Sequence, residues 1–316
     1  MQSSYKRIGV QAMQNKRIVF QFGNNTSPRY IEALFLPLQA GQWYSRMQLI
    51  DILHNKGYNI EGEHTISHNT VTWALAGLGE LNVRRAGNNP KNLFRLTELG
   101  RQLSDMCSTN AGLFYDVLHF LFYSAYRRAQ DIKYSRFWLY PELCDILWSE
   151  APVQVKAQII TNRLQIEFCE RFPGSNSAFN DISTQVIFPW LRALDPPFLT
   201  KSHAKSWAIR RVSCTPQLFH LATDFIYSAI ERLDYGTSLA IRQPQIEAIC
   251  KVCLLDPEHF WKMANLAQMT ISGFEIHQGQ WEKAILLDGP PDWIALPDFA
   301  QEQSSTENDL EEDDDA

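Results

Sequence analysis

The residues best suited to hold a metal ion are two closely spaced cysteines with a histidine behind them. Cys250 and Cys253 are separated by two residues, and His259 follows in the same stretch. A structural zinc site takes four ligands, and no second pair follows. Because the two cysteines fall in helical sequence, we expect them to line a hydrophobic core instead. His64 and His68 straddle the predicted start of a helix and do not clearly share a face, so we expect no metal there.

Residues for hydrolytic chemistry are sparse. A nuclease needs clustered carboxylates and a lysine to hold Mg²⁺ and stabilise charge. The nearest match is Asp131 and Lys133 with Asp116 upstream, but these acids fall in helical sequence, whereas such sites usually use strand ends. No G-x-x-x-x-G-K-[ST], H-E-x-x-H or G-x-S-x-G motif occurs. We therefore expect a protein that is not an enzyme and needs no cofactor.

Basic residues, by contrast, gather in two short stretches. The chain carries a net charge of −6, but residues 302–316 hold eight acids and no base, so the remaining body is near +2. Residues 82–101 contain five basic residues against one acid, and residues 196–223 contain four with no acid. Phosphate neutralisation supplies most non-specific affinity for DNA. The predicted backbone contacts are Arg84, Arg85, Lys91, Arg95, Lys201, Lys205, Arg210 and Arg211.

Three predicted helices and a hairpin position the first basic stretch. Helices are expected over residues 28–39, 45–57 and 67–81, with Ser45 as a cap and Gly57 as a left-handed end. Strands are expected over 82–86 and 93–96, joined by a turn rich in Gly, Asn and Pro.

The second strand of this hairpin passes into the next helix without a loop. The sequence LFRLTELGRQL (93–103) places Thr97 as the helix cap directly after the strand. This stretch resembles the wing-to-helix passage of MarR-like regulators in the winged helix-turn-helix superfamily. The resemblance covers about residues 28–107. It implies that the third helix enters the major groove of DNA and that the hairpin, or wing, lies along the phosphates.

The periodicity of the third helix predicts which residues face DNA. With Val71, Leu75 and Leu78 inward, the opposite face turns outward, and the first residues of the helix offer amides to phosphate. The predicted contacts are Ser67, His68, Asn69, Thr72 and Trp73. The helix carries no Arg or Lys, and Glu80 falls on its outer face, so this face could instead pack on another protein surface.

The middle of the chain is predicted to have the same order of elements, with helices followed by a two-stranded hairpin and a further helix. Helices are predicted over 138–147, 153–172 and 180–195, the last broken near Pro189, and a strand hairpin over 197–213 precedes a helix over 214–233. An aromatic-rich stretch between the two modules is expected to be a buried helix.

These patterns together predict a mostly α protein with tandem winged-helix-like units, joined by an aromatic-rich helical middle and ended by an acidic, disordered tail. The predicted parts are an N-terminal extension (1–27), a winged helix-turn-helix domain (28–107), a second winged-helix-like domain (108–234), C-terminal helices with an extended segment (235–300), and the tail (301–316). The extended segment either docks on another protein or folds back on the core, and we favour the second.

The function that these features predict is binding of double-stranded DNA. The protein would be a transcriptional regulator or, by a loose resemblance in the order of elements to proteins of bacterial phage-defence loci, one part of a defence complex. The alternative is a non-catalytic interaction subunit that uses the C-terminal segment and acidic tail to hold other proteins. With no signal peptide, no membrane span and scattered cysteines, we expect a cytoplasmic location. The DNA hypothesis requires both hairpins to be exposed and their arginines not to be neutralised by carboxylates.

Overall fold

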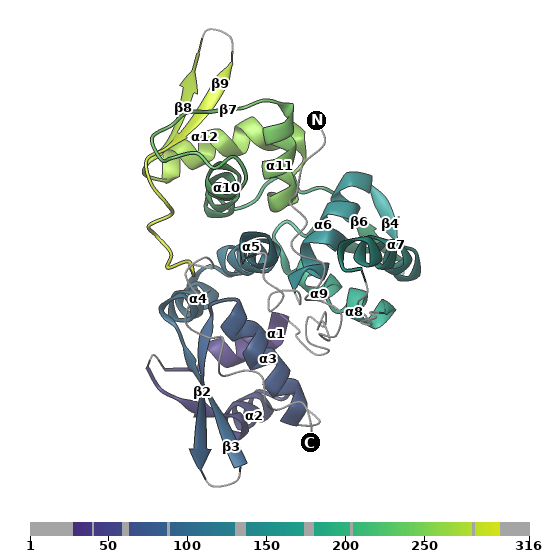
Figure 1. The fold of residues 1–316 in the computed structure, drawn as a ribbon, viewed down its shortest axis with the longest axis vertical. Coiled ribbons are helices and arrows are strands. Elements are labelled where there is room, and N and C mark those ends of the chain that lie inside the picture. The colour runs from purple at the N-terminus through teal and green to yellow at the C-terminus, as the bar shows by residue number, and fades with distance from the viewer. Residues whose placement is uncertain are drawn as a thin grey trace.

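The protein is mostly helical, with three small sheets. The computed structural model describes residues 28–39, 41–58, 63–86, 89–129, 137–173, 180–202, 205–279 and 282–297. Its elements fall into three units that share one order: a helix, a strand, further helices and a two-stranded hairpin (Figure 1). Each unit has a three-stranded antiparallel sheet with its last strand in the middle, in the orders β1-β3-β2, β4-β6-β5 and β7-β9-β8.

The first unit forms the lower end of the molecule in Figure 1. Its elements are α1 (Pro28–Phe35), β1 (Tyr44–Ser45), α2 (Arg46–Asn55), α3 (Glu63–Leu75), β2 (Gly79–Ala86) and β3 (Asn89–Leu96). Ser45 caps α2 with a reciprocal capping box to Gln48, and Gly57 ends it at a φ of 80°. Both were predicted. The third helix was placed too late in the sequence, because α3 begins at Glu63 and ends at Leu75.

The hairpin of the first unit runs straight into the next helix, as the sequence predicted. The Thr97 side chain accepts a hydrogen bond from the Gly100 amide and caps α4 (Glu98–Thr109). The same hydroxyl donates to the Gly77 carbonyl at 2.6 Å, which ties the start of α4 to the turn before β2. A wing strand that ends beside its neighbouring helix needs no loop to reach it.

The second unit follows the same order with a divided third helix. Its elements are α6 (Leu139–Glu150), β4 (Val153–Val155), α7 (Ala157–Arg171), α8 (Asp181–Gln185), α9 (Phe188–Ala193), β5 (Leu199–Ser202) and β6 (Lys205–Ala208). Residues 153–155, predicted as the start of a helix, form a strand that pairs with β6. The predicted break near Pro189 is confirmed, since this proline lies in the first turn of α9.

The third unit was not anticipated from the sequence. Its elements are α10 (Pro216–Asp224) with its π-helical continuation η3 (Phe225–Ile230), β7 (Leu239–Ala240), α11 (Gln243–Cys253), η4 (Pro257–His259), α12 (Phe260–Thr270), β8 (Phe274–Gln278) and β9 (Lys283–Leu287). Because α10 packs on α11 and α12, the expected boundary after residue 234 falls inside this unit. Cys250 and Cys253 of α11 are buried in the hydrophobic core, as expected.

Helix α5 (Ala111–Ala129) lies between the three units (Figure 1). It packs against α4, α6, α9, α10 and α11. Phe114, Phe120, Phe122 and Tyr123 are all buried along it, so the predicted aromatic helix is the shared core of the molecule. In the part of the chain that the structure describes, no helix combines the length and apolar character needed to cross a membrane.

An extended segment after β9 connects the third unit to the first. Trp293 donates through Nε1 to His220 Nδ1 at 3.3 Å, and the Ala295 amide donates to Gln102 of α4 at 2.9 Å. Pro297 then lies against Gly77, where a Cβ would come within 2.8 Å of the proline ring. The described part of this segment therefore folds back on the core, as favoured from the sequence.

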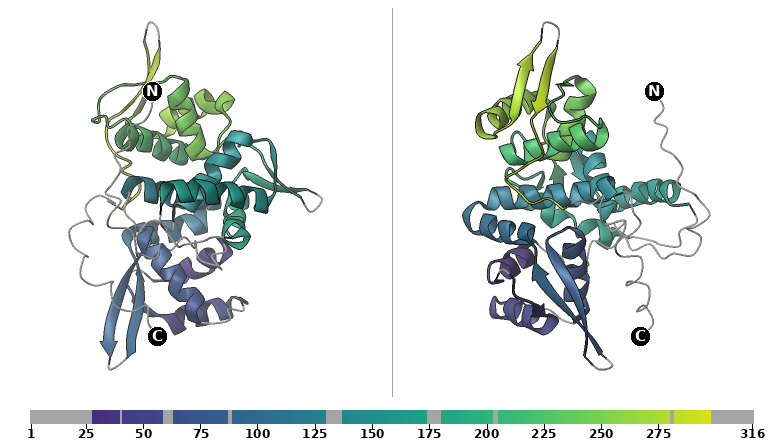
Figure 2. Two further views of the ribbon diagram at one scale, coloured as in Figure 1. Left: turned by 45° about the vertical axis from the view of Figure 1, so that its right-hand side comes forward. Right: turned by 60° about the vertical axis from the view of Figure 1, so that its left-hand side comes forward.

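The three hairpins point in different directions. In Figure 1, β2–β3 projects from one end of the long axis and β8–β9 from the other. The hairpin of the second unit projects from the side of the molecule (Figure 2). The hairpins therefore do not share a flat face.

Candidate nucleic-acid interface

The tip half of the first hairpin carries three of the predicted phosphate contacts. In the antiparallel register, Arg84 is paired with Lys91 and Arg85 with Pro90. The hairpin projects well beyond the helices of its unit (Figure 1). Three basic residues within a few positions of a protruding tip form an arrangement that can follow a polyanion. The side chains of this tip lie outside the described residues.

Arg95, nearer the base of the same hairpin, is neutralised within the protein. It is the register partner of Glu80 and forms an ion pair with it. Its guanidinium also lies over the Trp43 ring, 4.5 Å from the centroid. Its predicted role as a phosphate contact is therefore weakened, because a polyanion would have to compete with the Glu80 carboxylate.

The predicted DNA-facing side of the third helix is wrong. Asn69 and Thr72 are each 1% exposed and Trp73 is fully buried, so they cannot meet base edges in this conformation. Trp73 packs edge-on against Phe35 and Phe94, with both ring centroids 5.9 Å away. Ser67 and His68 lie in the second turn of α3 rather than at its start, and their side chains are outside the described residues.

The size of Trp73 explains this inversion. The spacing of Val71, Leu75 and Leu78 predicted that these residues face inward. Val71 and Leu75 are only half-buried, however, and Leu78 lies beyond the end of the helix. Burying an indole between two phenylalanines removes more apolar surface from water than burying one valine. The helix therefore turns Trp73 into the core.

The second hairpin keeps two of its four predicted contacts on the surface. Lys201 and Lys205 are exposed on either side of its tip, on neighbouring strands where Lys201 pairs with Ser206 and Ser202 with Lys205. Among the described residues neither lysine forms an ion pair. Their charges remain available to an anion in solvent.

Arg210 and Arg211 are not on this hairpin, which corrects the sequence interpretation. β6 ends at Ala208, and both arginines turn back into the protein. Arg210 donates through Nε to the Trp148 carbonyl at 3.0 Å and lies 4.5 Å from the Trp148 ring centroid. Arg211 is 1% exposed. The second hairpin therefore has half of its expected charge. The requirement for free arginines fails at Arg211, which Asp116 neutralises, so the hypothesis of DNA binding now depends on Arg84 and Arg85 of the first hairpin.

Arg211 is the centre of a buried polar network beneath α5. Its Nη2 lies 2.9 Å from Asp116 Oδ1, and both side chains are fully buried. Nη2 also donates to the Asp195 carbonyl at 2.7 Å. Thr215 donates to Asp116 Oδ2 through its amide at 2.8 Å and its hydroxyl at 2.9 Å. Burial raises the pKa of Asp116, while Arg211 and Thr215 favour its charged form. The network joins the second and third units to α5.

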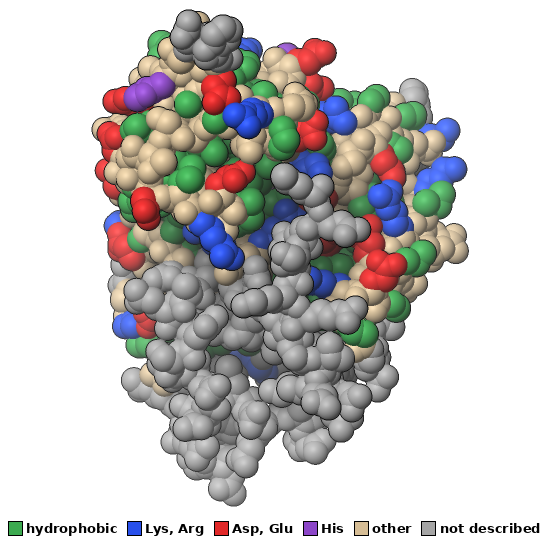
Figure 3. Space-filling view, turned by 45° about the horizontal axis from the view of Figure 1, so that its top comes forward, with side chains coloured by type: hydrophobic (Ala, Val, Ile, Leu, Met, Phe, Trp, Pro, Cys, Tyr) green, Lys and Arg blue, Asp and Glu red, His purple; other side chains and the backbone are tan. Residues whose placement is uncertain are grey.

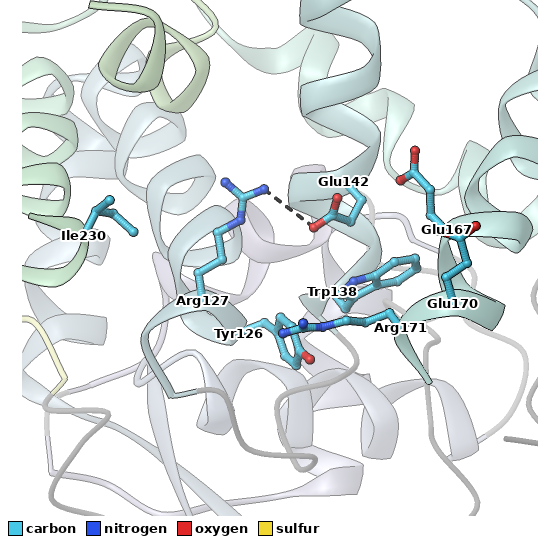
Figure 4. A pocket seen from close by; sticks show the side chains of 8 residues that line it. All are labelled: Tyr126, Arg127, Trp138, Glu142, Glu167, Glu170, Arg171 and Ile230. Carbon is cyan, nitrogen blue, oxygen red and sulfur yellow. Dashed lines mark ion pairs between the residues drawn. The ribbon is translucent and has the colours of Figure 1, made fainter. Parts of the chain in front are cut away.

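A polar cleft of about 550 Å³ opens where α5, α6, α7 and η3 meet (Figure 4). It is lined by Tyr126, Arg127, Trp138, Glu142, Glu167, Glu170, Arg171 and Ile230. Arg127 donates to Tyr123 at 2.7 Å and to Asp145 at 2.8 Å, and lies 3.6 Å from Glu142. Its charge is therefore committed to side chains of α5 and α6.

The acidic lining of this cleft makes it a poor site for a polyanion. Burial raises the pKa of Glu142, with Arg127 acting in the opposite direction. Burial also raises the pKa of Glu167, which Arg163 opposes. Carboxylates outnumber arginines in the lining, so phosphate would be repelled. We therefore assign the cleft no part in nucleic-acid contact.

The third unit differs from the others in charge. Residues 216–297 contain ten acidic and five basic residues, whereas residues 137–213 contain seven and eight. Figure 3 shows acidic side chains spread over the third unit, with basic ones at the edge formed by the second. Its hairpin carries Glu275, which pairs with His277, and Glu282, which pairs with Arg242. This unit is therefore unsuited to follow phosphates.

Two surface features were missed by sequence reasoning. The cleft is formed by residues of α5, α6, α7 and η3, which are far apart in the sequence, so no local sequence pattern indicated it. Trp207, which is 37% exposed on the second hairpin, could have been found from its local sequence. It alternates with Ser206 and Ala208 in a short strand, and a bulky residue on the side opposite a buried alanine must face outward.

Comparisons with known proteins show a similarity in fold only. No model of a known protein family matches the chain, and no curated protein matches it. A solved structure described as the SspB crystal structure is similar, with a TM-score of 0.56 over 83% of this chain and 81% of that chain. The two sequences are 11% identical. This chain therefore shares an overall architecture with SspB.

Proposed function

We propose that this protein binds double-stranded DNA through tandem winged-helix-like units. The hairpin of the first unit supplies the main contacts to the phosphates, through Arg84, Arg85 and Lys91. Lys201 and Lys205 of the second hairpin add a smaller contribution. The protein acts by occupying or bridging sites on DNA, in transcription control or as part of a larger defence complex, and not by chemistry of its own.

The observation that carries this proposal is the recurrence of one topology with basic residues at two of its hairpin tips. In each unit a strand from between the first helices joins a hairpin to form a sheet with the last strand in the middle. In winged-helix proteins that hairpin is the wing, which lies along the phosphate backbone. Arg84, Arg85 and Lys91 fall at its tip in the first unit.

Buried α3 side chains restrict how the DNA is recognised. With Asn69, Thr72 and Trp73 in the core, this helix offers few groups that discriminate between bases. Affinity then comes mainly from phosphate contacts, which carry no sequence information. We therefore expect weak sequence preference and a steep dependence of affinity on salt.

Binding of random-sequence duplex across a salt series tests this proposal. Replacing both Arg84 and Arg85 by Ala should lower affinity at low salt about tenfold or more. Since each lost phosphate contact flattens the plot of log affinity against log salt by about 0.9, the pair should flatten it by about 2. Lys262→Ala is the matched control, because it removes an exposed charge from α12 of the acidic third unit. Equal affinities for the double variant, the control and the original protein would refute the proposal.

An interaction subunit is the second candidate function, and the third unit favours it. Leu266 and Met269 are 38% and 81% exposed on one face of α12, within the acidic part of the chain. Such a surface suits a basic protein partner better than DNA. Absence of salt-sensitive DNA binding, together with a defined complex on gel filtration that Leu266→Asp abolishes, would support this function.

A further inference from the structure

The outer face of the second sheet combines an exposed aromatic ring with polar side chains. Trp207 on β6 is in register with Gln154 of β4 and Thr200 of β5. Residues directly opposite each other in a sheet share a face, as do residues two apart along a strand. Trp207, Gln154, Thr200 and Lys205 therefore lie on one face. The opposite face holds Leu199 and Ala208, which are buried.

Trp207 is unusual within this protein. Of the tryptophans that the structure describes, it alone is exposed, at 37%. The others pack in the core, as Trp73 and Trp190 do, or are half-buried. An indole left partly in water on an open sheet face loses the apolar burial that tryptophans normally gain. Its position suits stacking by a planar ligand.

The charged residues on the strands of this sheet, and directly after β4, are all basic. Lys205 lies on the same face as Trp207, Lys201 on the adjoining strand, and Lys156 directly after β4. Residues 151–166 and 196–223, which include all three strands of this sheet, contain no acid. A planar ligand that also carries negative charge would be complementary to this surface.

A groove of about 300 Å³ lies between β4, the edge strand of this sheet, and α7. It is lined by Gln154 and Lys156 together with Ile159, Ile160, Val153, Leu147 and Glu150. Glu150 is already paired with Arg163. Gln154, the register partner of Trp207, therefore lies at the border between the Trp207 face and this groove, and Lys156 lines the groove beside it.

We propose that this face binds an unpaired nucleotide within a nucleic-acid strand, with the base stacked on Trp207. Lys205 and Lys156 contact the flanking phosphates, and the Gln154 amide meets an edge of the base. Stacking on an aromatic ring beside lysines is how many proteins hold single strands, and it tolerates any base. This inference rests on the proposed function, in which the first unit makes the main contacts to the duplex, and adds that the second unit also holds unpaired nucleotides.

Anisotropy measurements with three labelled probes test this inference: a blunt duplex, the same duplex with a ten-nucleotide single-stranded extension, and oligo(dT). Stacking of one base contributes about 1–3 kcal/mol, so Trp207→Ala should weaken binding of the extended duplex and oligo(dT) about 5- to 150-fold. Binding of the blunt duplex should change less than about twofold. Trp207→Phe should retain most of the affinity, since the smaller ring still stacks.

Two control variants separate stacking from other effects. Ile166→Ala removes another exposed apolar side chain of the same unit, 63% exposed on α7, and should alter binding of none of the probes. Circular dichroism and thermal unfolding confirm that Trp207→Ala is folded. Arg84→Ala with Arg85→Ala should weaken the blunt duplex more than oligo(dT).

Three results are decisive. Selective loss with the extended probes, rescued by phenylalanine, supports the inference. Equal loss with all three probes, or no loss in a folded Trp207→Ala variant, overturns it while leaving duplex binding by the first unit intact. Failure of the original protein to bind any probe at low salt overturns the proposed function and this inference together.

Discussion

The Arg211→Ala variant tests whether Arg211 is a surface contact to phosphate, as the sequence predicts, or a buried residue of the core, as the structure shows. The sequence predicts a phosphate contact whose loss lowers DNA affinity and leaves stability unchanged. The structure places Arg211 in the core, 2.9 Å from Asp116 and hydrogen-bonded to the Asp195 carbonyl at 2.7 Å. The alanine variant would leave Asp116 buried and without its counter-charge. We therefore expect loss of stability, with little direct effect on DNA affinity.

The size of the effect follows from the burial of the pair. Both side chains have no exposed surface, and removing one partner of a buried ion pair costs about 3–5 kcal/mol, because the other charge stays in a medium of low polarity. The two hydrogen bonds from Thr215 to Asp116 remain and keep the cost within that range. For a protein of this size, each kcal/mol lowers Tm by about 2–4 °C. The melting temperature should fall by about 6–20 °C.

Urea unfolding followed by circular dichroism measures this loss directly. Arg163→Ala is the matched control, since its pairs with Glu150 and Glu167 are exposed and should contribute at most about 1 kcal/mol. Arg211→Met combined with Asp116→Leu should recover much of the stability lost in Arg211→Ala, because no unpaired charge then remains in the core. A fully stable Arg211→Ala protein with selectively weakened DNA binding would refute the reasoning and restore the sequence interpretation.

Two further predictions concern pH and the acidic tail. Burial lowers the pKa of His119 to about 3, whereas histidine in an unfolded chain titrates near about 6.5. As the pH falls below about 6.5 the unfolded chain takes up a proton that the folded protein resists. Stability present at pH 7 is therefore lost on acidification, by about 2 kcal/mol at pH 5. His119→Gln should remove this part of the pH dependence of the urea midpoint, and unaltered dependence in the variant would contradict the assignment. Deleting residues 302–316 removes eight acids from a chain whose described part ends at Pro297, beside the turn before β2. If the tail competes with phosphate for the basic hairpin, the truncated protein should bind duplex more tightly at low salt and no differently at high salt. Identical affinities at every salt concentration would count against competition.

Local features of the fold could be predicted from the sequence because they depend on neighbouring residues. Ser45 and Thr97 cap their helices through amides three positions ahead, and Pro216 starts α10 because its missing amide is not needed there. The hairpin before Thr97 and the buried aromatic helix α5 also follow from short-range patterns. The mostly helical class and the basic tip of the first hairpin were accessible in the same way.

The tertiary structure alone decided whether residues such as Trp73 and Arg211 lie in the core or at the surface. The phase of α3 depended on whether Trp73 or Val71 had the better partners, and Phe35 and Phe94 are far from Trp73 in sequence. Arg211 follows a basic hairpin, yet Asp116, 95 positions earlier on α5, draws it inside. The sheet of the third unit includes the two-residue strand β7, which pairs with β9 more than forty positions later in the chain. Local sequence sets the propensity of a segment, but competition for burial and for charge partners is settled between segments that the sequence keeps apart.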